Sequence, residues 1–359
     1  MLKEQYRFKD SKEIQERAEL LERLLPDGVY EYLNENADLN SEGTKIFDSG
    51  SLFDINIIEN KLTSIININR VNNLKYINKY FESVNHKLIF GGKIIGCVET
   101  YEQRKNRILK KNNKLISYPL YVFDFILKRV FPKLKITRKI YYLFTRGNNK
   151  AISKVETYGR LTSCGFDFVN EKEINNLLFF TFQKVSSPRY DTEPTYGFIA
   201  KLKRIGKDGK IITVYKIRTM YAYSEYLQEK IAEELGLDIG GKFKNDYRKT
   251  YWGKLLRAFW LDELPMLWNL IKGDLKLFGV RPLSQQYFNL YNEDLKKMRI
   301  KYKPGLIPPY YADMPKTLYE IMESERRYLT SYEKKPIRTQ WVYFWKAFYN
   351  IVFKDARSN

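Results

Sequence analysis

A proline and a glycine fix the limits of one short helix in the stretch 257–273, RAFWLDELPMLWNLIKG. Pro265 lacks a backbone N–H, which a helix tolerates only in its first turn, and Gly273 is a typical C-terminal stop. We therefore expect the helix to begin near Asp262, which puts the adjacent carboxylates Asp262 and Glu263 at its N-terminus. Its apolar residues recur at helical spacing and predict one buried face: Leu264, Leu267, Trp268 and Ile271.

The two acids have an ordinary structural explanation, because an acid that caps a helix or lies at its positive end contributes ~1 kcal/mol. Other charged residues favour a functional one. The chain offers five cations and a third acid that could join the pair: Lys216, Arg218, Asp246, Arg248, Arg257 and Arg281. Arginine side chains bind phosphate oxygens and carboxylates bind magnesium. The pattern predicts a site for phosphates and a divalent metal.

The composition narrows the classes of protein that the chain can belong to. It has 359 residues and 44% hydrophobic residues, enough for one large or two ordinary domains. Two cysteines argue against a disulfide scaffold and fit a reducing compartment, and a single histidine excludes multi-histidine metal sites. The net charge of +21 favours polyanionic partners such as anionic lipid, nucleic acid or phosphate-bearing substrates.

The sequence predicts attachment to a membrane surface without a transmembrane span. The N-terminus is polar, which indicates no signal peptide, and no apolar run reaches the roughly 18–20 residues that a spanning helix needs. Residues 117–147 instead form a basic, aromatic, amphipathic segment, with Asp124 and Lys128 on the face opposite the apolar residues. Residues 337–353 carry a second apolar stripe, rich in aromatic rings. Either segment could also pack on its own domain.

The order of elements predicts an α/β protein. Residues 1–40 read as a helical lead-in. Residues 41–186 alternate strands and helices, close on a hairpin at Asn175-Asn176, and contain the inserted segment 117–147. That order resembles the C-terminal half of a Rossmann-like methyltransferase without its glycine-rich loop, so a scaffold or regulatory role is the simpler interpretation. Residues 187–359 form a second unit that opens on a hairpin at Asp208-Gly209.

Residues 194–353 resemble the bacterial sugar transferase family, the monotopic polyprenyl-phosphate phosphoglycosyl transferases. KRIGKDGKIITVYKIRTM is similar to the family's strand-turn-strand that ends in K-F-R-T-M. The block from NDYR through GKLLRAFWLDELPMLWNLIKGDLKLFGVRPLS, followed by KYKPGL, matches its later motifs in order. The resemblance implies a small α/β catalytic domain with helices at the membrane surface.

The resemblance also implies a reaction. A sugar 1-phosphate passes from a nucleotide-diphosphate sugar, expected to be a UDP-sugar, to polyprenyl phosphate through a covalent aspartyl intermediate, which initiates surface glycan synthesis. By position Asp262 is the nucleophile and Glu263 a ligand of Mg²⁺, with Asp246 a second candidate ligand. The phosphate-binding residues are expected to be Arg257, Arg281, Lys216, Arg218 and Arg248. The protein is then expected on the cytoplasmic face of the bacterial inner membrane.

The chain departs from the family pattern at two places that bear on substrates. The family usually opens its catalytic domain with a long apolar re-entrant helix, where this chain has a hairpin and SSPRYDTEPTY. After PGL the chain reads IPPYYADMP where many members read T-G-x-x-Q-V, in a loop expected to touch the substrate.

Two other classes of function stay open. A basic protein that binds nucleic acid or anionic lipid through an inactive site would also use clustered cations with interleaved aromatic rings. The sequence contains no nucleic-acid motif, so no nucleic-acid partner is expected. A methyltransferase activity would rest on residues 45–186, and the absence of the glycine-rich loop from this sequence counts against it. Assembly into a homo-oligomer is compatible with the sequence.

Overall fold

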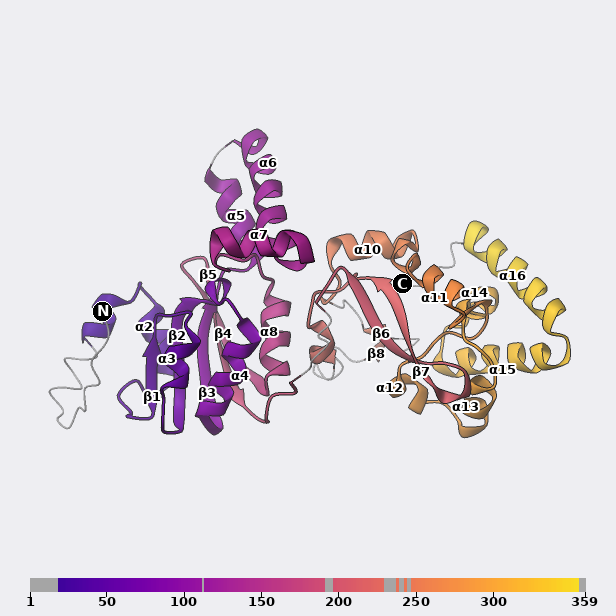
Figure 1. The fold of residues 1–359 in the computed structure, drawn as a ribbon, viewed down its shortest axis with the longest axis horizontal. Coiled ribbons are helices and arrows are strands. Elements are labelled where there is room, and N and C mark those ends of the chain that lie inside the picture. Colours follow the sequence, from indigo (N-terminus) through magenta and orange to yellow (C-terminus); the bar gives the residue numbers. More distant parts are fainter. Residues whose placement is uncertain are drawn as a thin grey trace. The chain divides into compact units, whose positions relative to one another are not determined.

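The computed structural model describes residues 19–111, 113–190, 196–228, 237–238, 242–243 and 247–354 (Figure 1). The chain forms two compact units. One comprises Met1–Pro194 with Ala222–Leu227, and the other comprises Thr195–Tyr221 with Gln228–Asn359. Part of the predicted helical lead-in, residues 1–18, lies outside the described residues. No helix in the described part of the chain is both long and apolar enough to span a bilayer.

The first unit is built on a five-stranded sheet in the order β1-β2-β3-β5-β4. Strands β1, β2 and β3 are parallel, β5 pairs antiparallel with β3, and β4 closes the sheet as the partner of β5 in a hairpin. The sheet strands are β1 (Thr44–Phe47), β2 (Leu62–Arg70), β3 (Leu88–Val98), β4 (Phe166–Ile174) and β5 (Leu177–Lys184). Their helices are α2 (Val29–Asn36), α3 (Leu52–Asn56), α4 (Ile77–Lys87) and α8 (Lys154–Ser163).

Local sequence signals set the hairpin of this unit. Asn175 and Asn176 both have positive φ (50° and 59°), the left-handed conformation that asparagine adopts more readily than most residues. The predicted turn is therefore confirmed. Tyr32 from α2 lies buried against this hairpin, with its hydroxyl 3.0 Å from Thr181 Oγ1.

A helical projection beyond the end of the sheet begins at Tyr101, ahead of the inserted segment 117–147, and includes most of that segment (Figure 1). It contains α5 (Tyr101–Lys111), α6 (Lys114–Phe125), a π-helical turn (Ile126–Val130), a 3₁₀ turn (Phe131–Lys133) and α7 (Lys135–Thr145). The helical run of α6 ends in this 3₁₀ turn, which contains Pro132.

The second unit is a mixed assembly of helices around short strand pairs. The strands form an antiparallel hairpin of β6 (Ile199–Ile205) and β7 (Ile211–Ile217), a short pair of β8 (Leu237–Asp238) and β9 (Lys242–Phe243), and a parallel pair of β10 (Lys276–Phe278) and β11 (Gly305–Ile307). The helices are α10 (Tyr251–Ala258), α11 (Met266–Lys272), α12 (Gln285–Asn289), α13 (Glu293–Ile300), α14 (Tyr310–Asp313), α15 (Leu318–Lys334) and α16 (Pro336–Phe353). Its main core gathers residues from β10 through α16, with Phe278, Leu295 and Tyr328 fully buried.

These units confirm the mixed α/β class. The Rossmann-like character of the first unit stays a prediction. The hairpin predicted at Asp208-Gly209 is confirmed, and both turn residues have positive φ, as a tight β-turn of this kind requires.

Candidate active site

The β6–β7 hairpin delivers the first two predicted cations. Lys216 lies near the end of β7, paired with Ala200 of β6, and Arg218 follows one residue beyond the strand. Arg218 Nε donates to the carbonyl of Gly197 at 2.7 Å, which ties the two ends of the hairpin together. The hairpin therefore fixes the direction in which Lys216 leaves the sheet.

Helix α10 places Arg257 against the same strand end. Thr250 caps the helix by accepting from Gly253 N at 2.9 Å, and its own backbone N–H donates to Thr219 O. Gly253 rests directly on the Thr219 backbone, where a Cβ would lie 2.0 Å from the Thr219 oxygen. Arg257 Nε donates to Thr219 Oγ1 at 2.9 Å. Thr219, which the sequence did not single out, therefore orients a predicted phosphate-binding arginine.

The two carboxylates lie in a separate 3₁₀ turn, Leu261–Glu263, ahead of α11. The expected start of α11 near Asp262 is wrong, since the α-helix begins at Met266 with Pro265 as its cap. The turn is entered through Trp260, whose φ of 53° is left-handed and costs a bulky side chain strain. Trp260 Nε1 donates to the Tyr311 hydroxyl at 3.0 Å, which compensates for part of that cost.

The predicted buried face of α11 is also wrong. Leu264, Leu267, Trp268 and Ile271 are exposed, and the helix buries Met266 and Asn269 instead. Asn269 is fully buried and bridges to β7: its Oδ1 accepts from Tyr215 N at 3.0 Å and its Nδ2 donates to Thr213 O at 2.7 Å. An asparagine within an apolar helix was the sequence signal for this contact. It holds the carboxylate turn beside Lys216.

The charged groups meet around Asp262. Lys216 Nζ donates to Glu263 Oε1 at 2.6 Å. Asp262 is 7% exposed. Burial raises the pKa of Asp262, with Glu263 adding to the effect, while Lys216 and Arg257 oppose it. Burial lowers the pKa of Lys216, and Arg281 lowers it further while Glu263 opposes the change. Asp262, Glu263, Lys216, Arg257 and Arg281 therefore share one electrostatic environment.

The loop that carries Arg281 is positioned by the meeting of two glycines. Gly279 of GVRP and Gly305 of PGL lie back to back, with Gly305 N donating to Val280 O at 2.9 Å and Gly279 N donating to Ile307 O at 3.1 Å. A second brace is the buried ion pair of Arg299 with Glu325, because the other arm of Arg299 donates to the Arg281 carbonyl. Neither Arg299 nor Glu325 was identified from the sequence, since their pairing joins α13 to α15.

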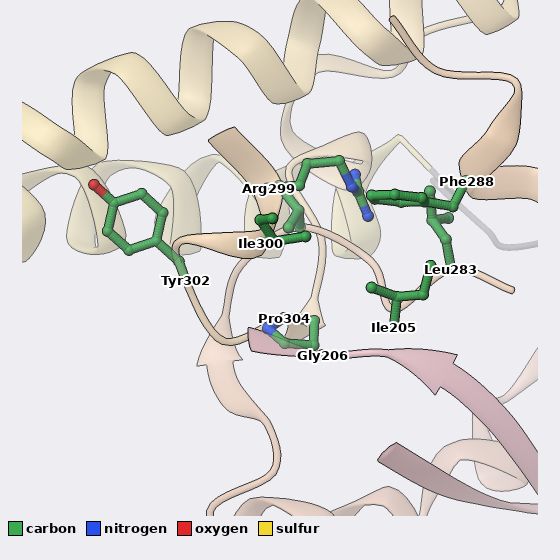
Figure 2. A pocket seen from close by; sticks show the side chains of 9 residues that line it. Ile205, Gly206, Leu283, Phe288, Arg299, Ile300, Tyr302 and Pro304 are labelled. Atoms are coloured by element: carbon green, nitrogen blue, oxygen red, sulfur yellow. The ribbon is translucent and has the colours of Figure 1, made fainter. Parts of the chain in front are cut away.

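Behind this loop lies a small cavity (Figure 2). It is lined by Ile205, Leu283, Phe288 and Arg299 among others, and the Arg299 guanidinium faces the Phe288 ring while Tyr302 points away. Its volume of about 10 Å³ has room for one water molecule. The cavity is therefore a packing gap behind the Arg281 loop and cannot hold a nucleotide sugar.

Two predicted site residues remain, Arg248 and Asp246. Arg248 is buried, and its carbonyl accepts from Tyr221 N at 2.9 Å. Asp246, the second candidate metal ligand, lies outside the described residues. Within the described ranges no group of three or more Asp, Glu, His or Cys side chains is gathered. Asp262 and Glu263 are thus the described carboxylates of the site.

A lysine exchange tests how Lys216 tunes Asp262. Lys216→Met removes a positive charge that lowers the pKa of Asp262, so that pKa rises further above its ordinary value. If ionised Asp262 is needed for turnover, the acid limb of kcat against pH moves to higher pH. Lys210→Met, an exposed exchange on the same hairpin, should leave the limb in place. An unmoved acid limb in Lys216→Met would contradict the assignment.

A buried carboxylate at a helix entrance, close to a lysine and arginines, is an arrangement that suits chemistry on phosphate groups. The comparisons agree: residues 188–352 match the family model for bacterial sugar transferases, so the C-terminal half of the chain belongs to that family. The predicted resemblance is confirmed.

Curated relatives each match part of the chain. The galactosyl transferase CpsE of Streptococcus agalactiae is 35% identical over 106 residues, 29% of this chain and 23% of the relative. The undecaprenyl-phosphate galactose phosphotransferase of Salmonella typhimurium is 37% identical over 109 residues, again 29% and 23%. The UDP-glucose:undecaprenyl-phosphate glucose-1-phosphate transferase of Caulobacter vibrioides is 32% identical over 105 residues, 29% of this chain and 36% of the relative. The chain thus spans about a quarter to a third of the length of these relatives.

Proposed function

We propose that the second unit transfers a sugar 1-phosphate from a nucleotide-diphosphate sugar to polyprenyl phosphate. The observation that carries the proposal is the buried Asp262 between Lys216 and Arg257, in a domain of the bacterial sugar transferase family. The names of the relatives include undecaprenyl phosphate and UDP-glucose, which supports a UDP-sugar donor and a polyprenyl acceptor. Another relative is named an exopolysaccharide production protein, which supports a role in initiating a surface glycan.

Asp262 is the nucleophile of the proposed reaction. One carboxylate oxygen of Asp262 attacks the phosphorus that carries the sugar, the bond to the bridging oxygen breaks, and the nucleoside monophosphate leaves with that electron pair. A phosphate oxygen of the polyprenyl phosphate then attacks the same phosphorus. This second step releases the Asp262 carboxylate and forms a lipid diphosphate sugar. Lys216, Arg257 and Arg281 hold phosphate oxygens and offset the charge that gathers there.

Glu263 is the proposed ligand of Mg²⁺. Magnesium in such sites is held by one or two carboxylates together with substrate phosphates, and Asp262 and Glu263 supply carboxylates next to three cations. Mg²⁺ would neutralise charge on the donor diphosphate. Glu263→Gln should weaken the Mg²⁺ dependence of nucleotide-sugar binding, measured calorimetrically without acceptor lipid, while Glu293→Gln at an exposed position of α13 should not.

The surface around the site supports a monotopic attachment at a membrane. Nine large apolar side chains of α10, α11 and the turns beside them are exposed: Tyr251, Trp252, Leu255, Phe259, Leu261, Leu264, Leu267, Trp268 and Ile271. Helix α16 adds exposed Ile337, Trp341, Trp345, Phe348 and Val352, while Phe344 packs partly into the core. Aromatic rings of this kind favour the lipid–water interface. We place the protein on the cytoplasmic face of the bacterial inner membrane, where the acceptor lipid is reached.

Release of nucleoside monophosphate tests the function directly. Membranes that hold the protein are incubated with polyprenyl phosphate, Mg²⁺ and a panel of nucleotide sugars. We expect one UDP-sugar to give acceptor-dependent monophosphate release that chelation of Mg²⁺ abolishes. No release from any donor, together with salt-sensitive RNA binding, would instead favour a basic binding protein whose site is inactive.

A further inference from the structure

The projection of the first unit, Tyr101–Thr145, turns some of its charged side chains inward. Arg104 clasps Asp124 of α6 through two hydrogen bonds, Nε to Oδ2 at 2.6 Å and Nη2 to Oδ1 at 2.7 Å. Arg129 and Lys133 both pair with Glu156 of α8, which is 2% exposed. Although burial alone would raise it, the pKa of Glu156 is held well below its usual range by these cations.

An amphipathic helix on a globular domain usually packs its apolar face inward, whereas this projection makes its inner contacts with charged residues. Burial and the Arg104 charge lower the pKa of Lys128, and its carbonyl accepts from Ala151 N at 3.0 Å. Arg129 and the carbonyl of Lys128 therefore fasten the projection to the sheet unit, while Asp124 ties α6 to α5 within the projection. Charge reversal at these positions would disrupt the fold and could not report on a surface.

Helices α6 and α7 of the projection also expose apolar side chains to solvent. Six large side chains of α6 and α7 are between 59% and 83% exposed: Leu115, Ile116, Phe123, Ile136, Leu143 and Phe144. Isolated exposed apolar residues are ordinary, but a set of this size on two successive helices marks an interaction surface. The structure therefore leaves large apolar side chains exposed on a segment whose inward-pointing charges are already paired.

The charge around that face identifies its partner. Residues 101–150 hold 14 Lys and Arg against Glu102 and Asp124. Five of these cations are exposed and make no ion pair within the described part of the chain: Lys110, Lys114, Arg138, Lys139 and Arg146. A second copy would bring an equally positive surface and be repelled. An anionic bilayer offers both an apolar interior and negative head groups.

We propose that the projection docks on anionic lipid, with the apolar side chains of α6 and α7 inserted at the interface and the exposed cations at the phosphates. It gives the first unit its own hold on the membrane, apart from the catalytic unit. The proposal rests on the proposed function only in one respect, since that function gives the reason why the protein must reach a membrane. Lipid binding is measured without donor or acceptor, so its failure is distinguishable from a failure of sugar-phosphate transfer.

A fluorescent label on the outer face tests the docking. Leu143→Cys in the full chain is labelled with an environment-sensitive dye, while Cys97 and Cys164 are buried and their thiol pKa values are raised to about 12 by burial. On vesicles of phosphatidylcholine with phosphatidylglycerol, we expect blue-shifted emission and shielding from iodide. The same dye at Phe90→Cys, an exposed position at the start of β3, should stay in water.

A charge variant separates this surface from the other apolar helices. Lys110, Lys114, Arg138 and Lys139 changed together to Glu should weaken the Leu143 dye response to anionic vesicles by about tenfold or more, because each cation contributes attraction to the leaflet. Nucleoside monophosphate release in detergent should persist in this variant. A vesicle-bound protein whose Leu143 dye stays in water would overturn the proposal. A blue shift that grows with protein concentration without vesicles would overturn it too, and would indicate self-association.

Discussion

Asp262→Asn is expected to abolish turnover and leave the protein folded. The amide has nearly the shape of the carboxylate but cannot attack phosphorus, so kcat should fall by about 10³-fold or more. Trapping with a labelled UDP-sugar should give a covalent adduct in the native protein and none in the variant. The residual rate then measures what Lys216, Arg257 and Arg281 achieve by positioning alone.

Stability should move in the opposite direction to activity. Burial raises the pKa of Asp262 in the folded state, so the folded protein binds this proton more tightly than the unfolded chain. At neutral pH the ionised carboxylate therefore costs stability, and that cost is relieved only as the pH falls through the raised pKa. The amide that replaces the carboxylate carries no charge, so the thermal midpoint of Asp262→Asn should equal or exceed that of the native protein at neutral pH.

An exposed exchange of the same chemistry is the control. Asp208→Asn alters the tip of the β6–β7 hairpin, where the backbone is left-handed and asparagine is well tolerated. It should leave turnover and adduct formation unchanged. Near-normal activity in Asp262→Asn would refute the covalent route through this residue, and an adduct mapped to Glu263 would transfer the role of nucleophile to its neighbour.

Local signals in the sequence predicted what short-range physics decides. Asn175-Asn176 and Asp208-Gly209 turn hairpins because these residues accept left-handed conformations, whatever surrounds them. The ordered sugar transferase motifs likewise identified Asp262, Glu263 and Lys216, which the structure brings together. Both kinds of signal lie within a few residues or within a shared family pattern.

Hydrophobic periodicity could not predict whether an apolar helix face is buried in the protein or exposed. On α11 the spacing of Leu264 and Trp268 is that of a single stripe, but the stripe is exposed and Asn269 faces the protein instead. Helix α6 shows the opposite case, because its charged residue Asp124 points inward and pairs with the buried Arg104 of α5. The period of a helix fixes which residues share a face, and only tertiary contacts decide where that face points.

Long-range pairs were missed for a different reason. Arg299 and Glu325 lie 26 residues apart on α13 and α15, and no local sequence pattern near either residue predicts their pairing. Gly279 and Gly305 are equally separated along the chain, although each sits in a recognisable motif. Their meeting explains why GVRP and PGL both carry glycine at these positions, since the two backbones occupy the space of a side chain.

Gly305→Ala is expected to destabilise the second unit strongly. A Cβ at Gly305 would lie 2.1 Å from Gly279 N and 2.5 Å from Gly279 Cα, and backbone on both sides leaves no flexible atom to move. The strands β10 and β11 must separate, which stretches the hydrogen bonds of Gly305 N to Val280 O and Gly279 N to Ile307 O. We expect a loss of about 3 kcal/mol, at the upper end of the range for overpacked sites. Because Arg281 follows Gly279 by two residues, activity should fall as well.

Urea unfolding followed by tryptophan fluorescence measures this loss where it arises. All five tryptophans, at positions 252, 260, 268, 341 and 345, belong to the second unit, so the signal reports on that unit alone. Gly197→Ala is the matched control, because its nearest neighbour to a Cβ is 3.9 Å away and its backbone conformation suits alanine. That control should stay within about 0.5 kcal/mol of the native protein. An unchanged midpoint in Gly305→Ala would mean that the strands have room for a side chain, and the close approach of the two glycines would no longer account for the position of the Arg281 loop.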